Sequence, residues 1–451
     1  GQLTPLVDRP GQVVAAIDRA YALGDGGVLL FGWQIFPGNK PCTITMHGHE
    51  EAVARLDECM QPLIRKDVVN HYRNRFPAVT DACGFVAWAG MPSRPGDKRA
   101  LCFDFGEHGA VWARVPLAQP ETSGLALAKE ILGMVPEPGR MSHALYGLFD
   151  AGLGRAIEAL HSMEPRAALM PEVQQFGSAC ENPELSVIVP LYGRHDFLRH
   201  QLAQFASDAD LMAADLIYVV DDPSIVAATL ALAARYQPLF RVPFRVAWYP
   251  RNLGFSGANN VGARLARGSY LVLLNSDVLP QKHGWLGRLK SAIETLPDAG
   301  AVGPLLEFAD GTVQHAGMYA REDAALPGFL LNTHRGMGMV WNGSMAPFEP
   351  PMLTAACLMI RKCDYHDIGG LDENYLAGDF EDADLCLALR KRGKRLWLVP
   401  DTRLWHLERQ SQDYGSSADQ RQMLTLYNAW RYRQKICRGE LADPTGMEIR
   451  V

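Results

Sequence analysis

The sequence predicts an α/β domain with a mostly parallel sheet from about residue 183 onward, preceded by a small β-rich domain and a helical connector. Three short, almost wholly apolar runs at 185–189, 216–220 and 270–274 carry this prediction. Turn-forming residues bound each run, as expected of strands that are buried on both faces. Stretches with helical spacing lie between them, and alternating strands and helices favour a helix-covered sheet. We expect these helices at 197–205, 225–236 and 257–266.

The β-rich domain is expected over residues 1–120 as a sandwich. A short helix is predicted at 13–21, followed by strand-like runs at 28–31, 84–88 and 110–115. Residues 121–182 are expected to be a helical connector, broken near the Pro-Glu-Pro-Gly sequence at 136–139, that ends in a linker from 165 to 183. We expect the α/β domain to span 183–412 and a C-terminal helical extension to span 413–451.

Composition limits the classes of function that the chain can have. The 451 residues suffice for two or more domains, and 44 Lys and Arg against 50 Asp and Glu give a net charge of −6. That sign argues against a nucleic-acid partner, which requires a basic face. Nine cysteines without a CxxC pair predict a reduced, cytoplasmic protein. No apolar run has the length of a transmembrane segment, and the first residues lack signal-peptide features.

Polar residues follow each of the three predicted strands. In an open α/β sheet, ligands bind beyond the carboxyl ends of the strands. Carboxylates gathered there are costly unless a cation or a hydrogen-bonding ligand compensates them. The alternative is that Asp221 or Asp222 caps the helix that begins near Ile225. The residues at these three strand ends are Pro190, Tyr192 and Arg194, then Asp221 and Asp222, then Asn275, Ser276 and Asp277.

Two further stretches complete an ordered set of motifs. The first is RNLGFSGANNVG at 251–262, and the second is GGLDE at 369–373, followed by GDFEDADL at 378–385 and then Trp405-His406. Together with the strand ends, this set resembles the family-2 glycosyltransferases with a GT-A fold, and most of all their rhamnosyl- and galactofuranosyltransferase-like members. The resemblance covers about residues 183–412 and leaves the first 180 residues uncovered.

The resemblance implies a nucleotide-sugar donor. Asp222 would hydrogen-bond the nucleobase, with Tyr192 and Arg194 lining it. Asn275-Ser276-Asp277 stands at the place of the family's DxD motif, with Asn275 in place of the first carboxylate. Asp277 and His406 would therefore hold Mn²⁺ or Mg²⁺ on the donor diphosphate. The donor-binding set implied in addition is Pro190, Asn252, Gly254, Phe255, Asn260, Asn275 and Ser276.

The resemblance also implies that Asp382 is the catalytic base and that Glu381 orients an acceptor hydroxyl. Asp382 opens a predicted helix, where the macrodipole favours an ionised carboxylate. The alternative is that Asp379, Glu381, Asp382 and Asp384 are ordinary charges of a first helical turn. Asp384 is expected to support the helix or the loop.

Several other residues have both a functional and a structural interpretation. His315 could line the sugar pocket, and His47 with His49 could bind a metal, although packing or surface histidines explain that second pair better. Trp88, Trp112 and Phe85 could stack on carbohydrate or fill a core. The basic, aromatic stretch 420–438 predicts a helix that either touches a membrane surface or an anionic lipid-linked acceptor, or packs on the α/β domain.

The function predicted from these observations is inverting, metal-dependent transfer of a sugar from a nucleotide-sugar donor to a hydroxyl of a bacterial-type glycan or lipid-linked glycan. The β-rich domain would bind acceptor or form a homo-oligomer. The alternative from another class is a non-catalytic carbohydrate-binding or scaffolding protein, which the Asn275 substitution favours and the retained Asp277, Asp382 and His406 oppose. A pyrophosphorylase-like enzyme would require a Gly-rich, Lys-containing loop after the first strand, and residues 190–194 do not supply one.

Overall fold

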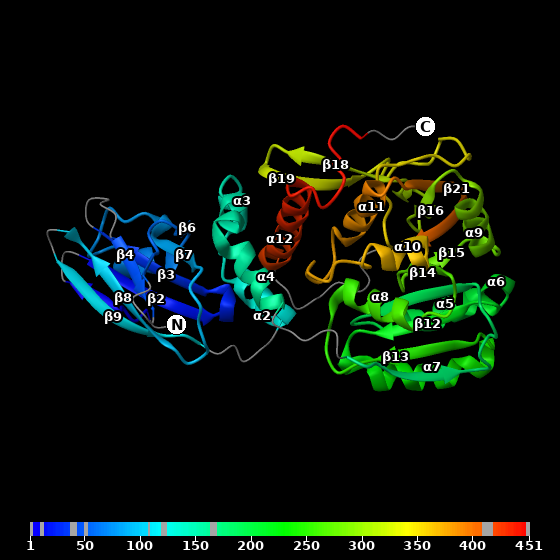
Figure 1. Ribbon diagram of the computed structural model, residues 1–451, viewed down its shortest axis with the longest axis horizontal. Coiled ribbons are helices and arrows are strands. Elements are labelled where there is room, and N and C mark those ends of the chain that lie inside the picture. Colours follow the sequence, from blue (N-terminus) through cyan, green and yellow to red (C-terminus); the bar gives the residue numbers. More distant parts are fainter. Residues whose placement is uncertain are drawn as a thin grey trace. The chain divides into compact units, whose positions relative to one another are not determined.

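The computed structural model describes residues 3–9, 13–36, 43–48, 53–106, 109–118, 124–162, 169–407 and 418–447. The chain divides into two compact units, whose helices and strands are labelled in Figure 1. Unit 1 comprises residues 1–166, 324–329 and 417–430. Unit 2 comprises residues 167–323, 330–416 and 431–451.

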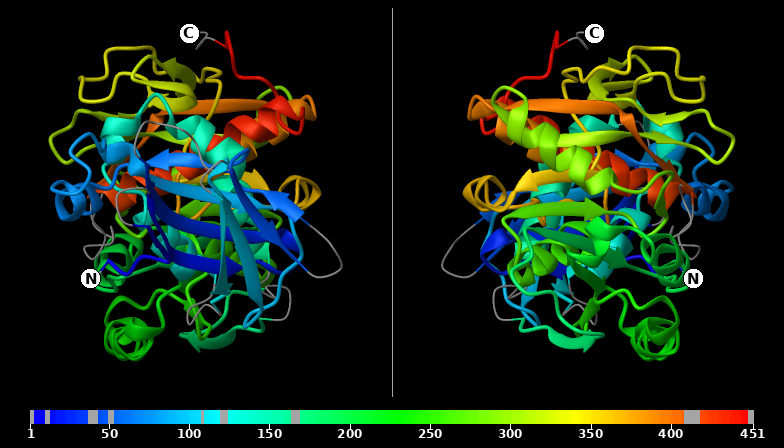
Figure 2. Two further views of the ribbon diagram at one scale, coloured as in Figure 1. Left: turned by 90° about the vertical axis from the view of Figure 1, so that its left-hand side faces the viewer. Right: turned by 90° about the vertical axis from the view of Figure 1, so that its right-hand side faces the viewer.

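Unit 1 contains two antiparallel sheets, seen in blue and cyan in Figure 2. The first sheet has the order β1-β2-β3-β7-β6, with β1 (Val7–Arg9), β2 (Val13–Ala22), β3 (Val28–Ile35), β7 (Gly84–Ala89) and β6 (Gln61–Leu63). The second has the order β5-β4-β8-β9, with β5 (Val53–Arg55), β4 (Thr43–His47), β8 (Lys98–Asp104) and β9 (Ala110–Pro116). Leu30 and Phe85 of the first sheet share one core cluster with Leu101 and Phe103 of the second. The expected β-rich domain is thus confirmed.

The helix predicted at 13–21 is wrong, because this segment is the strand β2. Its alternate residues enter two different cores: Ala15 packs in the cluster between the sheets, whereas Val14 packs with Val68 and Tyr72 of α1 (Lys66–Tyr72). A strand buried on both faces loses the apolar-polar alternation by which strands are usually recognised. A bulge between Ile17 and Arg19 disturbs the remaining period.

Besides α1, the described part of unit 1 has three α-helices where the connector was expected. They are α2 (Gly124–Gly133), α3 (Leu145–Leu148) and α4 (Gly154–Ser162), with a 3₁₀ turn at Pro138–Met141 near the expected break. The first part of α12 (Ala418–Cys437) also belongs to this unit, where the Trp430 ring stacks on Phe149 at 6.2 Å. The stretch expected to be a linker contains the strand β10 (Glu172–Phe176), which pairs with β13 in unit 2.

Unit 2 is an α/β structure built on a ten-stranded sheet. Its path is β10-β13-β12-β11-β14-β20-β16-β21-β15, with β17 (Val313–His315) paired to β16. The bounds are β11 (Leu185–Leu191), β12 (Asp215–Val220), β13 (Phe244–Trp248), β14 (Tyr270–Leu274), β15 (Val278–Pro280), β16 (Ala299–Glu307), β20 (Cys357–Arg361) and β21 (Arg395–His406). A separate ribbon pairs β18 (Met318–Asp323) with β19 (Leu326–His334).

The sheet is mixed, so the expectation of a mostly parallel sheet is not confirmed. Of the nine strand pairings described in it, four are parallel and five are antiparallel. The three runs used for the prediction are the strands β11, β12 and β14, and they are mutually parallel. Two of the five antiparallel pairings come from β20, which lies between β14 and β16 and runs against both.

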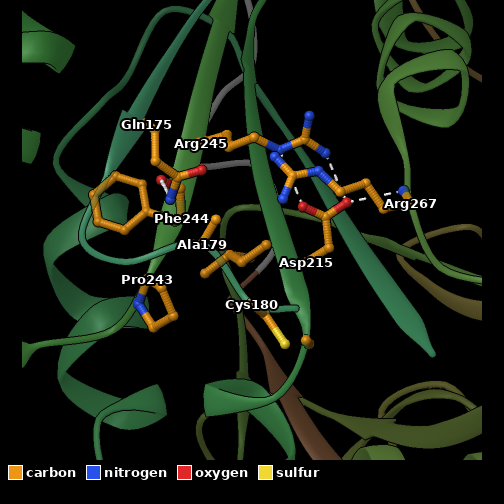
Figure 3. Close-up of a pocket in the computed structure, with 10 residues that line it drawn as sticks. Gln175, Ala179, Cys180, Asp215, Pro243, Phe244, Arg245 and Arg267 are labelled. Carbon is orange, nitrogen blue, oxygen red and sulfur yellow. Dashed lines mark hydrogen bonds and ion pairs between the residues drawn. The ribbon is translucent and has the colours of Figure 1, made fainter. Parts of the chain in front are cut away.

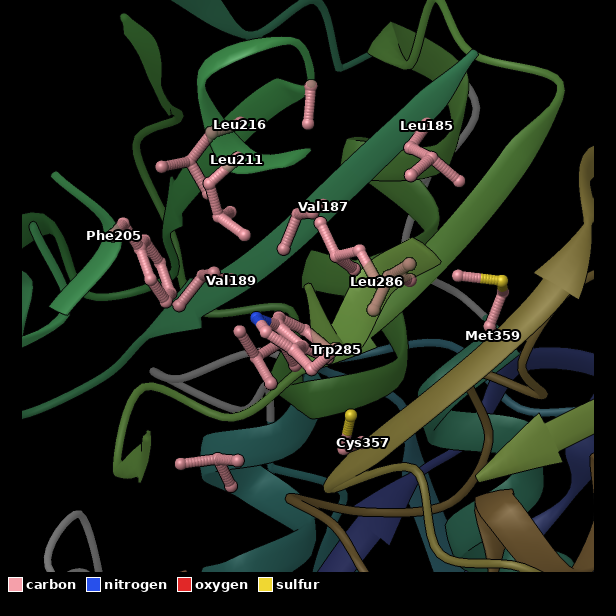
Figure 4. Close-up of a cluster of buried hydrophobic side chains, with 14 of the residues drawn as sticks. Leu185, Val187, Val189, Phe205, Leu211, Leu216, Trp285, Leu286, Cys357 and Met359 are labelled. Atoms are coloured by element: carbon pink, nitrogen blue, oxygen red, sulfur yellow. The ribbon is translucent and has the colours of Figure 1, made fainter. Parts of the chain in front are cut away.

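Helices cover the sheet of unit 2 on both faces. They are α5 (Phe197–Phe205), α6 (Ala209–Met212), α7 (Val226–Phe240), α8 (Gly254–Leu265), α9 (Trp285–Thr295), α10 (Lys362–Asp367) and α11 (Glu381–Lys391). On one face, Val187 and Val189 pack in a large core with Phe205 and Trp285 of the covering helices (Figure 4). Among the described residues, no helix has both the length and the apolar character needed to cross a membrane.

On the opposite face, α8 lies very close to the sheet. A Cβ atom at Gly262 would overlap the side chain of Ile188, which points to this face between Val187 and Val189. Glycine is therefore required at this point of the helix, although it lowers helix propensity. The close approach holds the second half of α8 against β11, and the start of the helix is joined to the carboxyl end of β12 by a hydrogen bond from the Leu253 amide.

Asp221 connects that strand end to α8. Its buried carboxylate accepts hydrogen bonds from Tyr249 Oη and from the Leu253 amide, both at 2.7 Å. Burial raises the pKa of Asp221 from 3.8 to about 7, although these hydrogen bonds oppose the shift. The folded chain therefore holds a proton on Asp221 at pH values where the unfolded chain has lost it.

We expect Asp221→Asn to change how stability depends on pH. The stability contributed by protonated Asp221 is fully present below about pH 4 and is lost as the pH rises through about 7, about 4 kcal/mol in all. The asparagine is neutral throughout, so the variant should gain stability relative to the wild type between pH 4 and 8. Urea unfolding of both proteins across this range measures the difference. Parallel pH profiles would contradict the prediction.

Candidate active site

The loop residues 353–356, immediately before β20, connect the predicted catalytic and metal-binding elements. The Ala355 amide donates to Asp382 Oδ2 at 3.2 Å. The carbonyl of Ala356 accepts from the Asn275 amide at 2.9 Å. One short backbone segment thus holds the start of α11 near the turn that follows β14.

The two residues on the other side of this loop add further connections. The Thr354 amide donates to His315 Nε2 at 3.4 Å. The Leu353 amide lies 3.3 Å from Cys386 Sγ of α11, and the same thiol donates back to the Leu353 carbonyl at 3.4 Å. Four successive residues therefore bring together α11, the end of β17 and the turn after β14.

The structure places Asp277 and His406 side by side. In the β15–β21 register, Val278 pairs with His406, so Asp277 lies one residue before the partner of His406. Asp277 Oδ1 is 3.5 Å from His406 Nε2. Both side chains are buried. The Nδ1 atom of His406 and the Oδ1 atom of Asn275 are buried without a hydrogen-bond partner. A bound water or ion is one of the usual partners of such buried polar atoms.

These residues fit a divalent cation only in part. A carboxylate oxygen and an imidazole nitrogen are accepted by Mn²⁺, and a carboxylate oxygen suits Mg²⁺. Within the described ranges, no group of three or more His, Cys, Asp or Glu side chains could hold a metal by itself. The remaining ligands would therefore be water and substrate oxygens, as expected for Mg²⁺ bound together with phosphates.

Glu381 and Asp382 occupy the first turn of α11 in different surroundings. Glu381 is buried, and its Oε2 atom has no hydrogen-bond partner. Asp382 is partly exposed and accepts from the amides of Ala355 and Ala383, at 3.2 and 2.8 Å. Of the two carboxylates, only Asp382 combines hydrogen-bond donors with access to solvent.

Burial opposes the ionisation of this acidic pair. Burial is the largest cause raising the pKa of both groups, and the neighbouring Asp382 and Asp379 raise that of Glu381 further, to well above its ordinary value. The helix macrodipole therefore does not by itself keep both carboxylates ionised. Two adjacent carboxylates in such a site share protons, and the hydrogen bonds to Asp382 favour its ionised form. We assign the retained proton to Glu381.

The residues expected to bind the nucleobase lie at the ends of β11 and β12. Asp222 Oδ2 accepts from the Gly193 amide at 3.3 Å, which brings it to the loop containing Tyr192 and Arg194. Asp222 Oδ1 also accepts from the Ser224 amide at 2.9 Å, so that Asp222 caps the 3₁₀ turn Pro223–Ile225 as well. Pro190 lies within β11.

Arg194 is engaged within the same loop. It forms an ion pair with Asp196 at 2.6 Å, and its guanidinium lies over the Phe197 ring at 4.6 Å.

The 251–262 motif forms the start of α8. Asn252 Oδ1 accepts from the Gly254 amide at 2.7 Å, and Gly254 has a φ of 76°, which favours glycine. The Phe255 amide donates to the Ala377 carbonyl at 3.0 Å and thereby joins this turn to the loop before α11. Ser276 is buried beside Asp277.

Asn260 has an internal role in the structure. Its Nδ2 donates to the Leu371 carbonyl and to Glu373 Oε1, at 2.8 and 2.9 Å, and its Oδ1 accepts from Tyr365 Oη at 2.6 Å. Both ends of this amide therefore order the GGLDE loop.

Sequence reasoning did not single out the 353–356 segment, because it acts through its backbone and carries no recognisable motif.

The structure also shows the surroundings of the histidines and aromatic residues for which both a functional and a structural role were considered. His315 is fully buried, and its Nδ1 lies 3.0 Å from His334 Nδ1; burial is the main cause holding the pKa of His315 well below its ordinary value. His47 is near Thr45 and Trp112 in unit 1, and His49 lies outside the described residues. Of the three aromatic residues considered for carbohydrate stacking, Phe85 is buried in the core and Trp112 is 60% exposed. Trp88 is partly buried, and its indole donates to the Gly26 carbonyl at 2.9 Å.

A small cavity lies away from these residues, at the beginning of β12 and β13 (Figure 3). Arg245 forms two hydrogen bonds to the buried Asp215 there, at 3.0 and 2.6 Å, and Asp215 also accepts from the Arg267 amide. The carboxylate is thus compensated internally. The cavity is at the opposite edge of the sheet from the strand ends, so it is not the candidate site.

Comparison with known proteins matches the part of the chain that carries the first motifs, whereas the motifs at 369–385 and His406 lie beyond residue 340. Residues 186–340 match the family model described as Glycosyl transferase family 2. The chain is 30% identical over 240 residues to an uncharacterized protein, y4gI, of Sinorhizobium fredii, a match that covers 53% of this chain and 26% of that protein. It is 29% identical over 263 residues to the O-antigen biosynthesis protein RfbC of Myxococcus xanthus, covering 55% and 19% of the two chains.

A third relative is the N-acetylglucosaminyl-diphospho-decaprenol L-rhamnosyltransferase of Mycobacterium tuberculosis, which is 29% identical over 150 residues, 30% of this chain and 46% of the relative. Among solved structures, GalNAc-T7 with UDP, GalNAc and Mn²⁺ matches 56% of this chain and 48% of its own, with 16% identity and a TM-score of 0.44. The chain spans less than half the length of each curated relative described here. Residues 186–340 of the chain are thus similar in sequence to glycosyl transferase family 2.

Proposed function

We propose that the chain is an inverting, metal-dependent glycosyltransferase with a GT-A fold that moves a sugar from a nucleotide-sugar donor to a hydroxyl of a glycan acceptor. The observation that carries the proposal is that the loop 353–356 binds both Asp382 and the turn of Asn275, which leads to the Asp277–His406 pair. The names of two relatives, an O-antigen biosynthesis protein and a rhamnosyltransferase that acts on a lipid diphosphate, favour a bacterial polysaccharide or lipid-linked glycan as acceptor.

Asp277 and His406 would hold a divalent cation together with the donor diphosphate. A cation there supplies Lewis-acid stabilisation of the charge that develops on the leaving nucleoside diphosphate. The two side chains are already adjacent and buried, so little reorganisation is required of them. Asp222 and the loop at 192–194 would bind the nucleobase, and the turn at Asn252–Gly254 would line the donor site.

Asp382 would accept the proton of the acceptor hydroxyl as its oxygen attacks the donor carbon. Its raised pKa brings its basicity closer to neutral pH, where a general base is most effective. Protonated Glu381 would keep a second negative charge away from the base and would donate a hydrogen bond to an acceptor oxygen. A single displacement by the acceptor oxygen inverts the configuration at the donor carbon.

Removal of Asp277 tests the metal assignment. We expect Asp277→Ala to abolish donor turnover and to weaken nucleoside diphosphate binding, because the cation loses its only carboxylate ligand in this pair. EDTA should have the same effect on the wild type, and Mn²⁺ or Mg²⁺ should reverse it. Asp401→Ala, an exposed position on the same strand as His406, is the control. Full activity in excess chelator would rule out the metal site.

Asp382→Asn tests the base. The variant keeps the shape of the side chain but cannot accept the proton, so transfer should fall by about 10²–10⁴-fold. Nucleoside diphosphate affinity should change less than about tenfold, or about 1.4 kcal/mol. NMR of the wild-type product should show an anomeric configuration opposite to that of the donor. Asp367→Asn, exposed on α10, is the control. Near-normal transfer by Asp382→Asn, or a retained configuration, would contradict the assignment.

We further propose that unit 1 binds glycan acceptor through Trp112. This side chain stands on the outer face of the β5-β4-β8-β9 sheet, beside His47 at 4.8 Å between ring centres. An exposed indole offers a flat apolar surface for the C–H face of a sugar, and imidazole and Thr45 Oγ1 offer hydrogen bonds to its hydroxyls.

Trp112→Ala should therefore lower the affinity for polymeric acceptor about tenfold. It should leave transfer to a short acceptor unchanged. Affinity electrophoresis against a panel of bacterial O-polysaccharides measures the first effect, and Val53→Ala on the same sheet is the control. Equal retardation of the Trp112 variant and the wild type by every polysaccharide would show that this face is not the acceptor site.

A further inference from the structure

The last part of α12 lies beyond the segment that matches the family model, yet it contacts both sides of the acidic pair. Residues 431–437 belong to unit 2. Three of their side chains, Arg431, Tyr432 and Lys435, contact the segment 372–384, which contains Glu381 and Asp382 near its end.

The first set of contacts is ionic. Asp372 Oδ2 accepts from Arg431 Nη2 at 2.7 Å and from Lys435 Nζ at 2.9 Å. The same ammonium group lies 2.5 Å from Asp384 Oδ2, which also accepts from Tyr375 Oη at 2.8 Å. These four charged side chains are at most 13% exposed. Removal of one partner would leave a buried charge without compensation, which is strongly unfavourable.

The second contact is aromatic and supports an unfavourable backbone. The ring of the buried Tyr432 packs on Phe380 at 5.4 Å. Phe380 immediately precedes Glu381 and has a φ of 74°, and Ala377 and Asp379 also have positive φ values, of 63° and 91°. Residues other than glycine hold this conformation only where the surrounding structure imposes it. Tyr432 supplies part of that surrounding structure.

The geometry of a helix connects these contacts to the base. Successive residues of an α-helix are about 100° apart, so Asp382 and Asp384 point to nearly opposite faces of α11. Lys435 holds Asp384 toward α12. Asp382 is thereby directed away from α12 and toward the loop 353–356, where the Ala355 amide meets it.

We propose that Arg431, Tyr432 and Lys435 form a C-terminal clamp that positions Asp382 and Glu381 for the acceptor hydroxyl. The clamp rests on the proposed function, because it assigns a positioning role relative to the proposed base. It makes α12 a part of the active site although none of its residues touches substrate. The clamp residues act on the orientation and rigidity of the first turn of α11, not on the donor site.

Lys435→Met is the principal test. It should lower kcat about tenfold to 10²-fold, since small misplacements of a catalytic group have effects of that size. The KM for donor and the affinity for nucleoside diphosphate should stay within about twofold, which separates the effect from general loss of structure. Lys435→Arg keeps the charge and the tether and should restore most of kcat. Arg433→Met, which removes an exposed ion pair with Glu322 on the same part of α12, is the matched control.

A second variant separates charge balance from tethering. Lys435→Met combined with Asp384→Asn removes the unpaired carboxylate and should recover thermal stability, but it should not recover kcat. This variant also keeps the test available if Lys435→Met alone does not fold. Recovery of kcat by the double variant would overturn the proposal, because charge balance alone would then explain the loss.

Amide hydrogen exchange provides a readout that does not depend on catalysis. Residues 376–384 should exchange at least several times faster in Lys435→Met than in the wild type and in Arg433→Met. Failure of the wild type to transfer any sugar would contradict the proposed function but would leave this measurement valid. Unchanged exchange in 376–384 together with unchanged kcat in folded Lys435→Met would overturn the clamp.

Discussion

The candidate site depends on the hydrogen bonds made by the backbone of residues 353–356. Ala355 and Ala356 bind, through peptide groups alone, the base candidate on α11 and the turn that carries Asn275. A backbone amide cannot change rotamer, so the distance between these elements is fixed by the path of the main chain. The strand β20, which follows directly, is held between β14 and β16. The central sheet thus sets the separation between the proposed metal ligands and the proposed base.

The carboxylates of unit 2 differ in the groups that compensate their charge. Asp215, Asp372 and Asp384 are buried against cations, which makes them structural. Asp221 is buried with neutral donors and becomes an acid with a pKa near neutrality. Glu381 and Asp382 have no cationic partner described, so their protonation depends on each other and on what binds beside them. The lack of a described cationic partner therefore separates Glu381 and Asp382 from the paired carboxylates of the unit.

The sequence correctly predicted those elements whose hydrophobic pattern fits only one kind of secondary structure. The runs at 185–189, 216–220 and 270–274 are strands of the sheet, and the helix expected at 197–205 has those bounds in the structure. It failed for β2, whose two faces enter different cores. It did not anticipate the antiparallel strand β20, because a hydrophobic pattern carries no information on strand direction. The family resemblance pointed to Asp277, His406 and Asp382, and the fold places Asp277 beside His406 and Asp382 on the loop 353–356. The peptide groups of 353–356 have no side-chain signature, so their role appears only in three dimensions.

The backbone before α11 limits which sequences this segment can accept. Ala377, Asp379 and Phe380 are three non-glycine residues with positive φ within four positions. Glycine or asparagine would adopt this conformation with less strain, whereas valine, isoleucine and threonine would be excluded by clashes at Cβ. Among relatives that share this loop, the side chains at these positions should therefore vary little in shape, even where their polarity differs. In a substitution screen of this loop, the backbone conformation that a residue can adopt would limit the accepted residues more than the polarity of its side chain.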